Sequence, residues 1–364
     1  MSHVTGIMLV DAPATALNNA GKDEEVRGVD NAVAVKFIRA PDGKYPYVSA
    51  QAIRYWVRNT LSHEHGWTPS PVFRETKVAY TDAEPTKFAE DDLFGYMRAA
   101  SKSTDVKKAA KRAEIAAVST PIDSDAGEVT RISPFRVGTL VSISPVRITG
   151  DFGTMARAEG DPVPHVHQFY KAVLKAPLAM DLAATGTFFI SKRVGYKNID
   201  KNRIESARNA GATEAKVYGF DALRLPIEVR KQRVKMLVQA IGRIEGGAKQ
   251  TLHLTDTAPS VLVLAVCKSG NQPFMRLFTN DGLGSTVFRT DVLEEATKVF
   301  KEEILSDIFI GWAKGFLDEE RKKLEEVLKS GGGKINEKAV TVSHPREAAD
   351  AFSTSLSEHA EWFE

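Results

Sequence analysis

Three long polar side chains recur at helical spacing in YVSAQAIRYWVRNTL, residues 47–61. Gln51, Arg54 and Arg58 are three and four residues apart, so they share one face if the segment is a helix. Amide and guanidinium groups on one face can hold consecutive phosphates of a nucleic acid without reading its bases. A solvated helix surface explains the same pattern, and both interpretations stay open.

A second candidate is the glycine pair in GRIEGGAKQT, residues 242–251. Gly246 and Gly247 allow a close approach of the backbone to a ligand, and their N–H groups, beside Lys249 and Gln250, can cradle phosphates. The spacing to a Lys-Ser or Lys-Thr pair that defines a P-loop is absent. The alternative is a helix C-cap followed by an ordinary turn.

A third candidate is the glycine-punctuated segment 193–221, where basic groups alternate with flat or apolar ones. Its basic residues, together with the residue before it, are Lys192, Arg193, Lys197, Lys201, Arg203, Arg208 and Lys216. The flat or apolar residues are Tyr196, Ile199, Val217, Tyr218 and Phe220. Such a mixture suits single-stranded nucleic acid, because charges neutralise the backbone and rings stack on bases. A surface hairpin with its own small apolar cluster is an equal alternative.

Acid chemistry has one candidate region, the polar turn at 18–31, which holds Asp23, Glu24, Glu25 and Asp30 beside Lys22 and Arg27. A carboxylate placed against a phosphate can assist RNA cleavage, although turns are commonly acidic. Two His-x-His pairs, at 63–65 and 165–167, lack a nearby cysteine or third ligand. We therefore expect no zinc site, and no other cofactor.

The distribution of charge points to a polyanionic partner. The 364 residues carry a formal net charge of only +2, but residues 186–250 contain 14 Lys or Arg against 6 Asp or Glu. Residues 291–364 are acidic, with 10 basic against 17 acidic side chains. The single cysteine, Cys267, excludes an intrachain disulfide, and we expect a cytoplasmic protein. The longest apolar run, 261–267, is too short to span a membrane.

The elements that must position these groups follow a recognisable order. Strands are predicted at 4–17, 33–38, 135–148, 178–190 and 261–267, and helices at 47–61, with Ser49 as N-cap, and at 226–244. The core order strand, helix, strand, strand, helix, strand is that of a ferredoxin-like, or RRM-like, unit. Residues 62–134, with proline clusters and one helix near 91–100, read as an insertion. Two charged helices are predicted near 291–329 and 345–362.

Four segments in this order resemble a known family. TGIMLVDAPATALNNAG, VSAQAIRYWVRNTL, DDLFGYM and GGAKQTLHLTD are similar to the backbone subunit of type I CRISPR Cascade complexes. The nearest branch is the type I-B DevR family within the RAMP superfamily. The resemblance covers most of residues 4–270.

The resemblance implies an α+β fold shaped like a right hand. An RRM-like palm would comprise residues 1–61, 135–192 and 222–280, with a finger insertion at 62–134 and a thumb β-hairpin at 193–221. Residues 281–364 would form a C-terminal helical extension. Copies would stack along a guide RNA (crRNA) beside other Cascade subunits, leaving bases free to pair with target DNA, without contact to a membrane.

The resemblance also implies roles for single residues. Gln51, Arg54 and Arg58 would hold guide phosphates, the Gly246–Gln250 loop would approach the same backbone, and Tyr218 or Phe220 would wedge at a displaced base. The full set of expected RNA-binding residues is Asn19, Lys22, Arg27, Lys36, Ser49, Gln51, Arg54, Arg58, Arg136, Lys192, Arg193, Lys197, Lys216, Tyr218, Phe220, Gly246, Gly247, Lys249 and Gln250.

Type III relatives cleave target RNA with an aspartate in the loop after the first strand. Asp23 and Asp30 lie in the corresponding region, but type I relatives are not known for this cleavage. We therefore expect a non-catalytic subunit. An RNA endonuclease that uses Asp23 or Asp30 is the alternative.

Overall fold

The computed structural model describes residues 2–22, 31–75, 78–99, 114–115, 117–123, 127–155, 161, 163–191 and 197–364. Eight residues discussed above lie outside these ranges: Asp23, Glu24, Glu25, Arg27, Asp30, Lys192, Arg193 and Tyr196. The side chain of Lys22 is likewise outside the described part of the chain.

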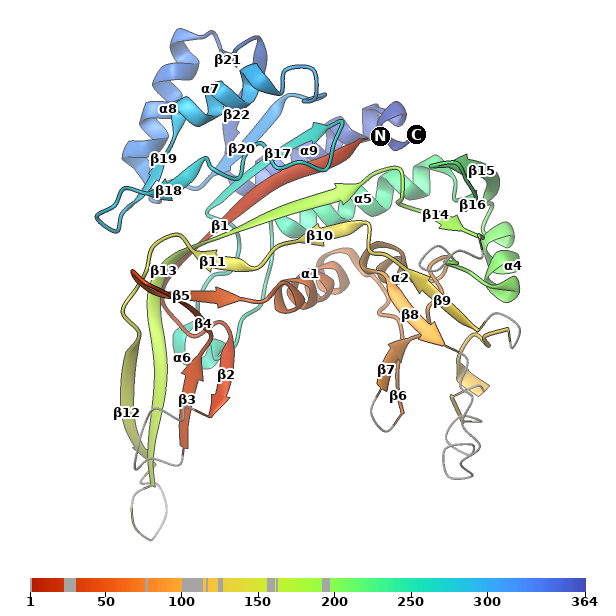
Figure 1. The fold of residues 1–364 in the computed structure, drawn as a ribbon, viewed down its shortest axis with the longest axis horizontal. Helices are drawn as coiled ribbons and strands as arrows, with labels where there is room; N and C mark the ends of the chain where they lie inside the picture. The colour runs from red at the N-terminus through yellow and green to blue at the C-terminus, as the bar shows by residue number, and fades with distance from the viewer. Residues whose placement is uncertain are drawn as a thin grey trace.

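The fold is a mixed α/β arrangement around one large sheet. Within the described residues this sheet has 13 strands, and its main path runs β21-β22-β20-β17-β1-β13-β11-β5-β4 (Figure 1). β1 (His3–Thr15) lies at the centre, antiparallel to both β13 (Val163–Asp181) and β17 (Val261–Cys267). All seven residues of β17 are buried, as its unbroken apolar sequence predicts.

On one side of β1 the sheet continues through strands that lie far apart in the sequence. β10 (Phe135–Val137) and β11 (Leu140–Ser142) both pair with β13, and β5 (Gly43–Val48) and β4 (Phe37–Ala40) complete that edge. The stretch β17-β1-β13-β11 is antiparallel throughout. The predicted strands at 4–17 and 261–267 are β1 and β17, and the segment 135–148 contains β10 and β11. The strand predicted at 178–190 was wrong, because β13 begins at Val163 and ends at Asp181, and residues 182–186 form turns.

Two hydrophobic cores cover the two faces of the sheet. Met8 and Val10 of β1 face a core that includes α1 (Ala50–His65), α5 (Ile227–Ile241) and α9 (Pro345–Glu358). Ile7 and Leu9 face a second core beneath α7 (Thr290–Val299) and α8 (Asp318–Ser330). Successive side chains of a strand point to opposite faces, so one apolar strand supplies both cores.

The prediction of a purely helical C-terminal extension was wrong. IFIGW forms β20 (Ile308–Trp312), antiparallel to β17, and β22 (Lys338–Ser343) lies parallel to β20. The short strands β21 (Lys334–Ile335), β18 (Phe278–Asn280) and β19 (Thr286–Phe288) and a terminal 3₁₀ turn, Ala360–Phe363, complete this region. A short apolar run fits a buried strand or a buried helix equally well. Here the run forms a strand, which pairs with β17.

Two groups of strands project on the same side of the sheet, and α1 lies between them (Figure 1). The first, which we call the arm, is β12 (Thr149–Met155), the start of β13, β3 (Asn31–Val35) and β2 (Asn19–Lys22). The second contains two antiparallel strand pairs, β6–β7 (Val72–Glu75, Val78–Thr81) and β8–β9 (Tyr96–Ala99, Glu128–Arg131). The helix predicted near 91–100 is the shorter α2 (Ala89–Phe94), because Gly95 ends it at a φ of 72° and β8 follows.

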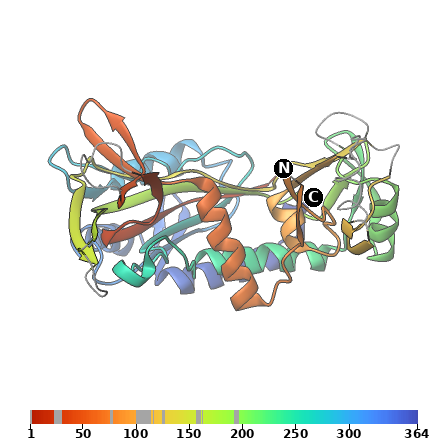
Figure 2. The ribbon, with the colours of Figure 1, turned by 90° about the horizontal axis from the view of Figure 1, so that it is seen from below.

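A third unit contains the described part of the predicted thumb. β14 (Thr187–Phe189), α4 (Lys201–Asn209), β15 (Thr213–Val217) and β16 (Phe220–Arg224) enclose a small core around Phe188 and Leu223. We call these elements the β14–β16 unit. The unit and the arm lie at opposite ends of the molecule (Figures 1 and 2). Among the described residues, no helix is long and apolar enough to cross a membrane.

Candidate nucleic-acid interface

The glycine loop, residues 245–249, is held between α1 and the end of β1. The Glu245 amide donates to Thr60 Oγ1 at 3.1 Å, and the Ala248 amide donates to the Leu17 carbonyl at 3.0 Å. A Cβ added to Gly246 would lie 2.3 Å from Cγ of Trp56, so no larger residue fits there. Gly247 has a φ of +106°, which favours glycine. The pair predicted from sequence is thus required by packing as well as by turn geometry.

Strain marks the residues that follow the glycine pair. Lys249 and Leu254 flank the short helix α6 (Gln250–His253), and both have positive φ angles, 53° and 44°. Such angles are uncommon for residues other than glycine and concentrate at functional sites. The side-chain amide of Gln250 donates through Nε2 to the Gly246 carbonyl and, at 3.0 Å, to the Thr255 carbonyl. Gln250 therefore braces the loop.

One cationic side chain of the loop, Lys249, contacts the arm. Lys249 Nζ lies 2.6 Å from Nδ1 of His167, on the first part of β13. The rings of His165 and His167 lie 4.9 Å apart on this strand. Burial lowers the pKa of Lys249. An ammonium that contacts one imidazole nitrogen has donors left for a further acceptor, such as a phosphate oxygen.

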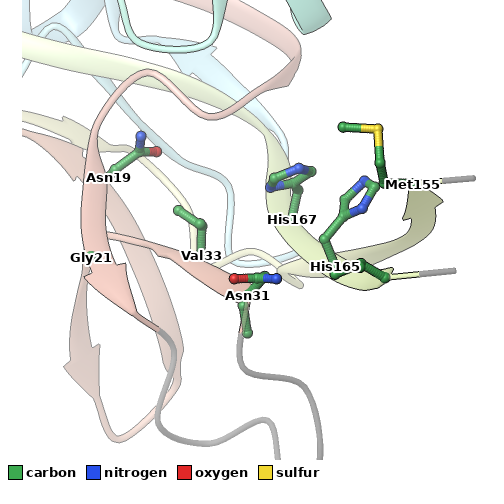
Figure 3. Close-up of a pocket in the computed structure, with 9 residues that line it drawn as sticks. Asn19, Gly21, Asn31, Val33, Met155, His165 and His167 are labelled. Atoms are coloured by element: carbon green, nitrogen blue, oxygen red, sulfur yellow. The ribbon is translucent and has the colours of Figure 1, made fainter. Parts of the chain in front are cut away.

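His165 and His167 also line an open cavity of about 800 Å³ between the arm strands (Figure 3). Asn19, Asn31 and Met155 line it as well, so the described side chains of its wall are amides, imidazoles and apolar groups. The backbone amide of Lys36 donates to the Asn18 carbonyl at 3.2 Å, next to this wall. Asn19 thus lines the same cavity as His167, the partner of Lys249, and the backbone of Lys36 lies next to it.

The histidine beside Lys249 should make the folded state sensitive to acid. Burial and then the charge of Lys249 lower the pKa of His167 from 6.5. As the pH falls, the unfolded chain binds the proton first, so the free energy of unfolding should decrease between about pH 7.5 and about pH 5.5. In His167→Gln, whose amide oxygen still accepts from Lys249, the decrease should be smaller. Urea unfolding at both pH values measures it, and identical pH dependence in the two proteins would contradict this prediction.

The face predicted on α1 is partly internal. Arg54 Nη1 donates to Ser133 Oγ at 3.0 Å and to the Phe135 carbonyl at 2.9 Å, and Nη2 donates to the Phe94 carbonyl. Burial, and then the neighbouring Arg58, lower the pKa of Arg54 to about 10. Both guanidinium groups lie over the Phe94 ring, at 5.2 and 4.7 Å from its centroid.

The helix face therefore joins α1 to the base of the second projecting group. Gln51 is exposed and Arg58 is half-buried. Ser49 is the N-cap of α1, as predicted, and its hydroxyl accepts from the Ala52 amide at 3.4 Å. Helical spacing identified the shared face but not what covers it. RNA contacts by Gln51, Arg54 and Arg58 stay a prediction.

The remaining predicted residues belong to the other end of the molecule. In the β14–β16 unit, Phe220 packs edge-on against Phe189, with ring centroids 6.2 Å apart. Lys216 is exposed, with its ammonium 4.0 Å from Asp221, and Lys197 bridges to Ile190. Arg136 and Tyr218 line a small cavity beside this unit. The structure thus gathers the predicted residues into separate groups rather than one site.

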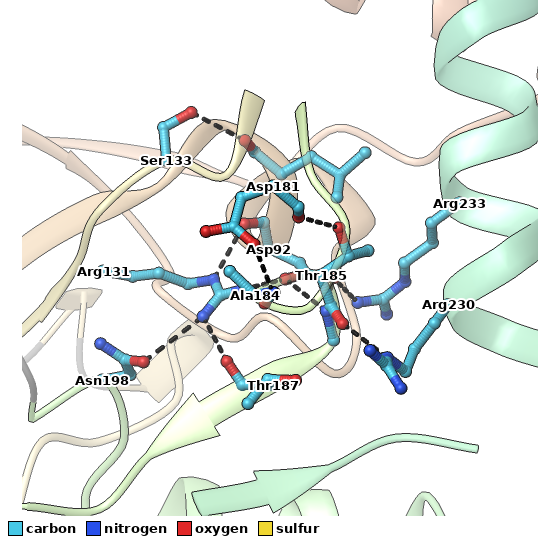
Figure 4. A network of polar contacts seen from close by, with 12 residues as sticks. Asp92, Arg131, Ser133, Asp181, Ala184, Thr185, Thr187, Asn198, Arg230 and Arg233 are labelled. Carbon is cyan, nitrogen blue, oxygen red and sulfur yellow. Dashed lines mark hydrogen bonds and ion pairs between the residues drawn. The ribbon is translucent and has the colours of Figure 1, made fainter. Parts of the chain in front are cut away.

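A buried ionic network, missed by sequence reasoning, holds the modules together (Figure 4). The fully buried carboxylate of Asp92 on α2 pairs with Arg131 on β9 and, at 2.6 Å, with Arg233 on α5. The Gly186 amide also donates to it, at 3.0 Å. Arg131 further donates to the Thr187 carbonyl at 2.7 Å. Asp92 and Arg233 are 141 residues apart, so no local pattern could reveal the pair.

Metal ligation has no candidate in the described ranges, where no three His, Cys, Asp or Glu side chains gather in a way that could hold an ion. His63 and His65 lie in the last turn of α1, which extends beyond the predicted end at residue 61. Positive charge is favourable at that end of a helix.

Comparison with known proteins identifies the family. A family model described as the CRISPR-associated negative auto-regulator DevR/Csa2 matches residues 8–282. A chain of a solved "CRISPR RNA-guided surveillance complex" is 12% identical, with a TM-score of 0.50, over 97% of this chain and 99% of that one. A chain of a "CRISPR RNA-guided surveillance complex, pre-nicking" is 11% identical, with a TM-score of 0.49, over 97% and 100%. No curated protein matches.

The first of these structures shows a shared fold at low sequence identity. The family model carries more weight, because it matches most of the chain, including β13, α1, the glycine loop and β17. The protein therefore belongs to the CRISPR-associated DevR/Csa2 family.

Proposed function

We propose that this protein is a non-catalytic, guide-RNA-binding backbone subunit of a CRISPR RNA-guided complex, and that its copies stack along the RNA. Family membership supports the assignment to such a complex. The observation that carries RNA binding is the strained glycine loop, where Lys249 Nζ lies 2.6 Å from Nδ1 of His167 on the arm. A tight backbone beside a cation is suited to a phosphate.

The strand order supports an RRM-like palm. β17-β1-β13-β11 has the order and antiparallel pairing of a ferredoxin-like sheet, with α1 and α5 packed in one core. In this proposal the guide follows α1 between the two projecting groups of strands. The second projecting group, β6 to β9, takes the place of the fingers. The arm is a second candidate for the thumb, besides the predicted 193–221, because it extends beyond the sheet (Figure 1).

A subunit that accepts any guide must contact backbone and shape, while base pairing reads sequence. Replacing Lys249 with Ala should therefore weaken the binding of every guide alike. The slope of log affinity against log salt should fall by about one, because one phosphate contact is lost. Fluorescence anisotropy with two guides of unrelated sequence, at several salt concentrations, measures both effects.

A matched control for this variant is Lys322→Ala, on the outer face of α8, where Lys322 pairs with Glu319 at 2.7 Å. Its affinity should equal that of the native protein. A loss in Lys249→Ala that depends on guide sequence would contradict backbone recognition.

The non-catalytic part of the proposal has its own test. The assembled complex is incubated with RNA that matches the guide, in the presence of Mg²⁺. We expect intact RNA. Regular cuts that disappear in Asp23→Ala or Asp30→Ala would instead establish the endonuclease.

A further inference from the structure

The contact between Lys249 and His167 fixes the protonation state of the histidine. Nζ of Lys249 lies 2.6 Å from Nδ1 of His167. An ammonium offers donors only, so Nδ1 supplies its lone pair to the contact and carries no proton. The other ring nitrogen, Nε2, then holds the hydrogen of a neutral imidazole. His167 is therefore neutral in this structure, and it can be protonated only if the contact with Lys249 is broken.

The strands of the arm bring one more imidazole and one carboxylate to His167. The His165 ring lies 4.9 Å from the His167 ring, on the same strand (Figure 3). On one side, β12 places Asp151 directly opposite His167 in the antiparallel register. On the other side, β3 places Val33, which does not titrate, beside it. The arm therefore contributes one acid close to two imidazoles.

The short helix α6 adds a third imidazole from outside the arm. The His253 ring packs against that of Phe169, with centroids 5.7 Å apart. Its Nε2 is buried, and no described residue forms a hydrogen bond with it. Burial, and then the charge of Lys249, lower the pKa of His253. Among the groups that act on His167, the single carboxylate of Asp151 thus faces one ammonium and two further imidazoles.

An anion bound to Lys249 would change the state of His167. The two nitrogen atoms are close enough to donate to the oxygens of one phosphate group, once they no longer face each other. A nearby negative charge favours the protonated imidazole, and it offsets the repulsion between imidazolium and ammonium. Hydrogen bonds between ionised partners are also roughly twice as strong as neutral ones. Binding of a phosphate and protonation of His167 therefore favour each other.

We infer that His167 is a second phosphate ligand beside Lys249, and that it takes up one proton from solvent when RNA binds. In the free protein, the ammonium donates to the neutral ring. In the complex, the ammonium and the imidazolium both donate to phosphate oxygens. This inference rests on the proposed function and deepens it, because it makes the binding of the guide dependent on pH. His167 is not among the RNA-binding residues that the sequence predicts.

Acid should therefore strengthen the binding of RNA. Phosphodiester groups stay anionic across the range in which histidine titrates, so the protein binds the proton. Affinity rises as the pH falls if a group has a higher pKa in the complex than in the free protein. Burial, and then the charge of Lys249, hold the pKa of His167 below 6.5 in the free protein, whereas a phosphate raises it. We expect affinity to increase about tenfold from about pH 7.5 to about pH 5.5.

Two measurements on the full chain test the proton uptake. Fluorescence anisotropy with a single-stranded RNA oligonucleotide, at both pH values and several salt concentrations, gives the affinity and its salt dependence. The slope of log affinity against log salt should be steeper by about one at the lower pH, because His167 adds a phosphate contact. Isothermal titration calorimetry at about pH 6.5, in two buffers of different ionisation enthalpy, counts the protons, and we expect about one per bound chain.

Three variants assign the proton to one histidine. In His167→Gln, the amide oxygen still accepts from Lys249 but cannot be protonated, so the proton uptake and the rise in affinity should both be lost. His165→Gln should keep both, because the contact with the ammonium is made by His167. His63→Gln, which removes an exposed imidazole from the last turn of α1, is the control and should also keep both. Circular dichroism at both pH values verifies that each chain is folded.

The outcomes separate this inference from the proposed function. If the native chain binds no RNA at either pH, the proposed function fails. If RNA binds without proton uptake, or if the uptake persists in His167→Gln, the inference alone is overturned. Should His167→Gln not fold, His167→Asn replaces it under the same criteria. Equal affinity of the native chain at the two pH values overturns the inference without any variant.

Discussion

Replacing Asp92 with Ala is expected to lower the free energy of unfolding by about 3–5 kcal/mol. The Asp92 carboxylate is fully buried and pairs with Arg131 and Arg233, whose side chains are 2% and 9% exposed. Removing it leaves two buried guanidinium groups without their counter-ion, and such groups are costly in a medium of low polarity. Since the network joins α2 and β9 to α5, the second projecting group of strands should lose its fixed position relative to α5.

Urea or thermal unfolding of the native chain and of Asp92→Ala measures this effect. The matched control is Asp291→Ala, which removes an exposed carboxylate from an ion pair with Arg289 and should leave the midpoint unchanged. A loss below about 1 kcal/mol in Asp92→Ala would place the network among surface-like pairs and contradict its structural role.

Replacing Gly246 with Ala should greatly reduce guide binding without unfolding the protein. The new Cβ would lie 2.3 Å from Cγ of Trp56, which is 6% exposed and packed in the core beneath the sheet. Overpacking of this kind costs about 1–3 kcal/mol, and the loop can relieve it only by moving. That movement carries Lys249 away from His167 and opens the phosphate site, so every guide should bind more weakly.

Gly270→Ala is the control for this substitution, because its nearest new neighbour would be a His3 ring atom at 3.7 Å. Circular dichroism and RNA anisotropy on both variants separate loss of the loop from loss of the fold. Native affinity in Gly246→Ala would show that the loop does not contact the guide.

The sequence predicted well those elements that have a local signature. Ser49 caps α1, an apolar stripe defines α5, and the apolar run at 261–267 is the buried strand β17. Strand β12 of the arm was not predicted. Its sequence, TGDFGTM, is almost wholly exposed and contains two glycines, so it shows neither apolar alternation nor high strand propensity. β20 was missed because its apolar run, IFIGW, is short and lies within residues 291–329, which were predicted as a charged helix.

In the candidate site, too, residues with a local sequence pattern were predicted and their distant partners were not. Gly246, Gly247 and Lys249 were found because glycines beside a cation form a local pattern, and the structure adds the partner His167. Arg54 was grouped correctly with its helix face, but its acceptors at Ser133 and Phe135 lie 79 and 81 residues away. Side-chain partners at such separations depend on tertiary packing, which a single sequence does not display.

The central position of β1 has a consequence for synthesis on the ribosome. Its two neighbours, β13 and β17, end at residues 181 and 267, so the first strand leaves the exit tunnel long before either can pair with it. At about 5–20 residues per second, roughly 250 further residues take on the order of tens of seconds. The apolar nascent segment HVTGIMLV has neither of its edges paired until β13 is complete, and the edge that pairs with β17 stays open for the whole of that time. Holdase chaperones that bind extended apolar peptides would be expected to engage this nascent chain early.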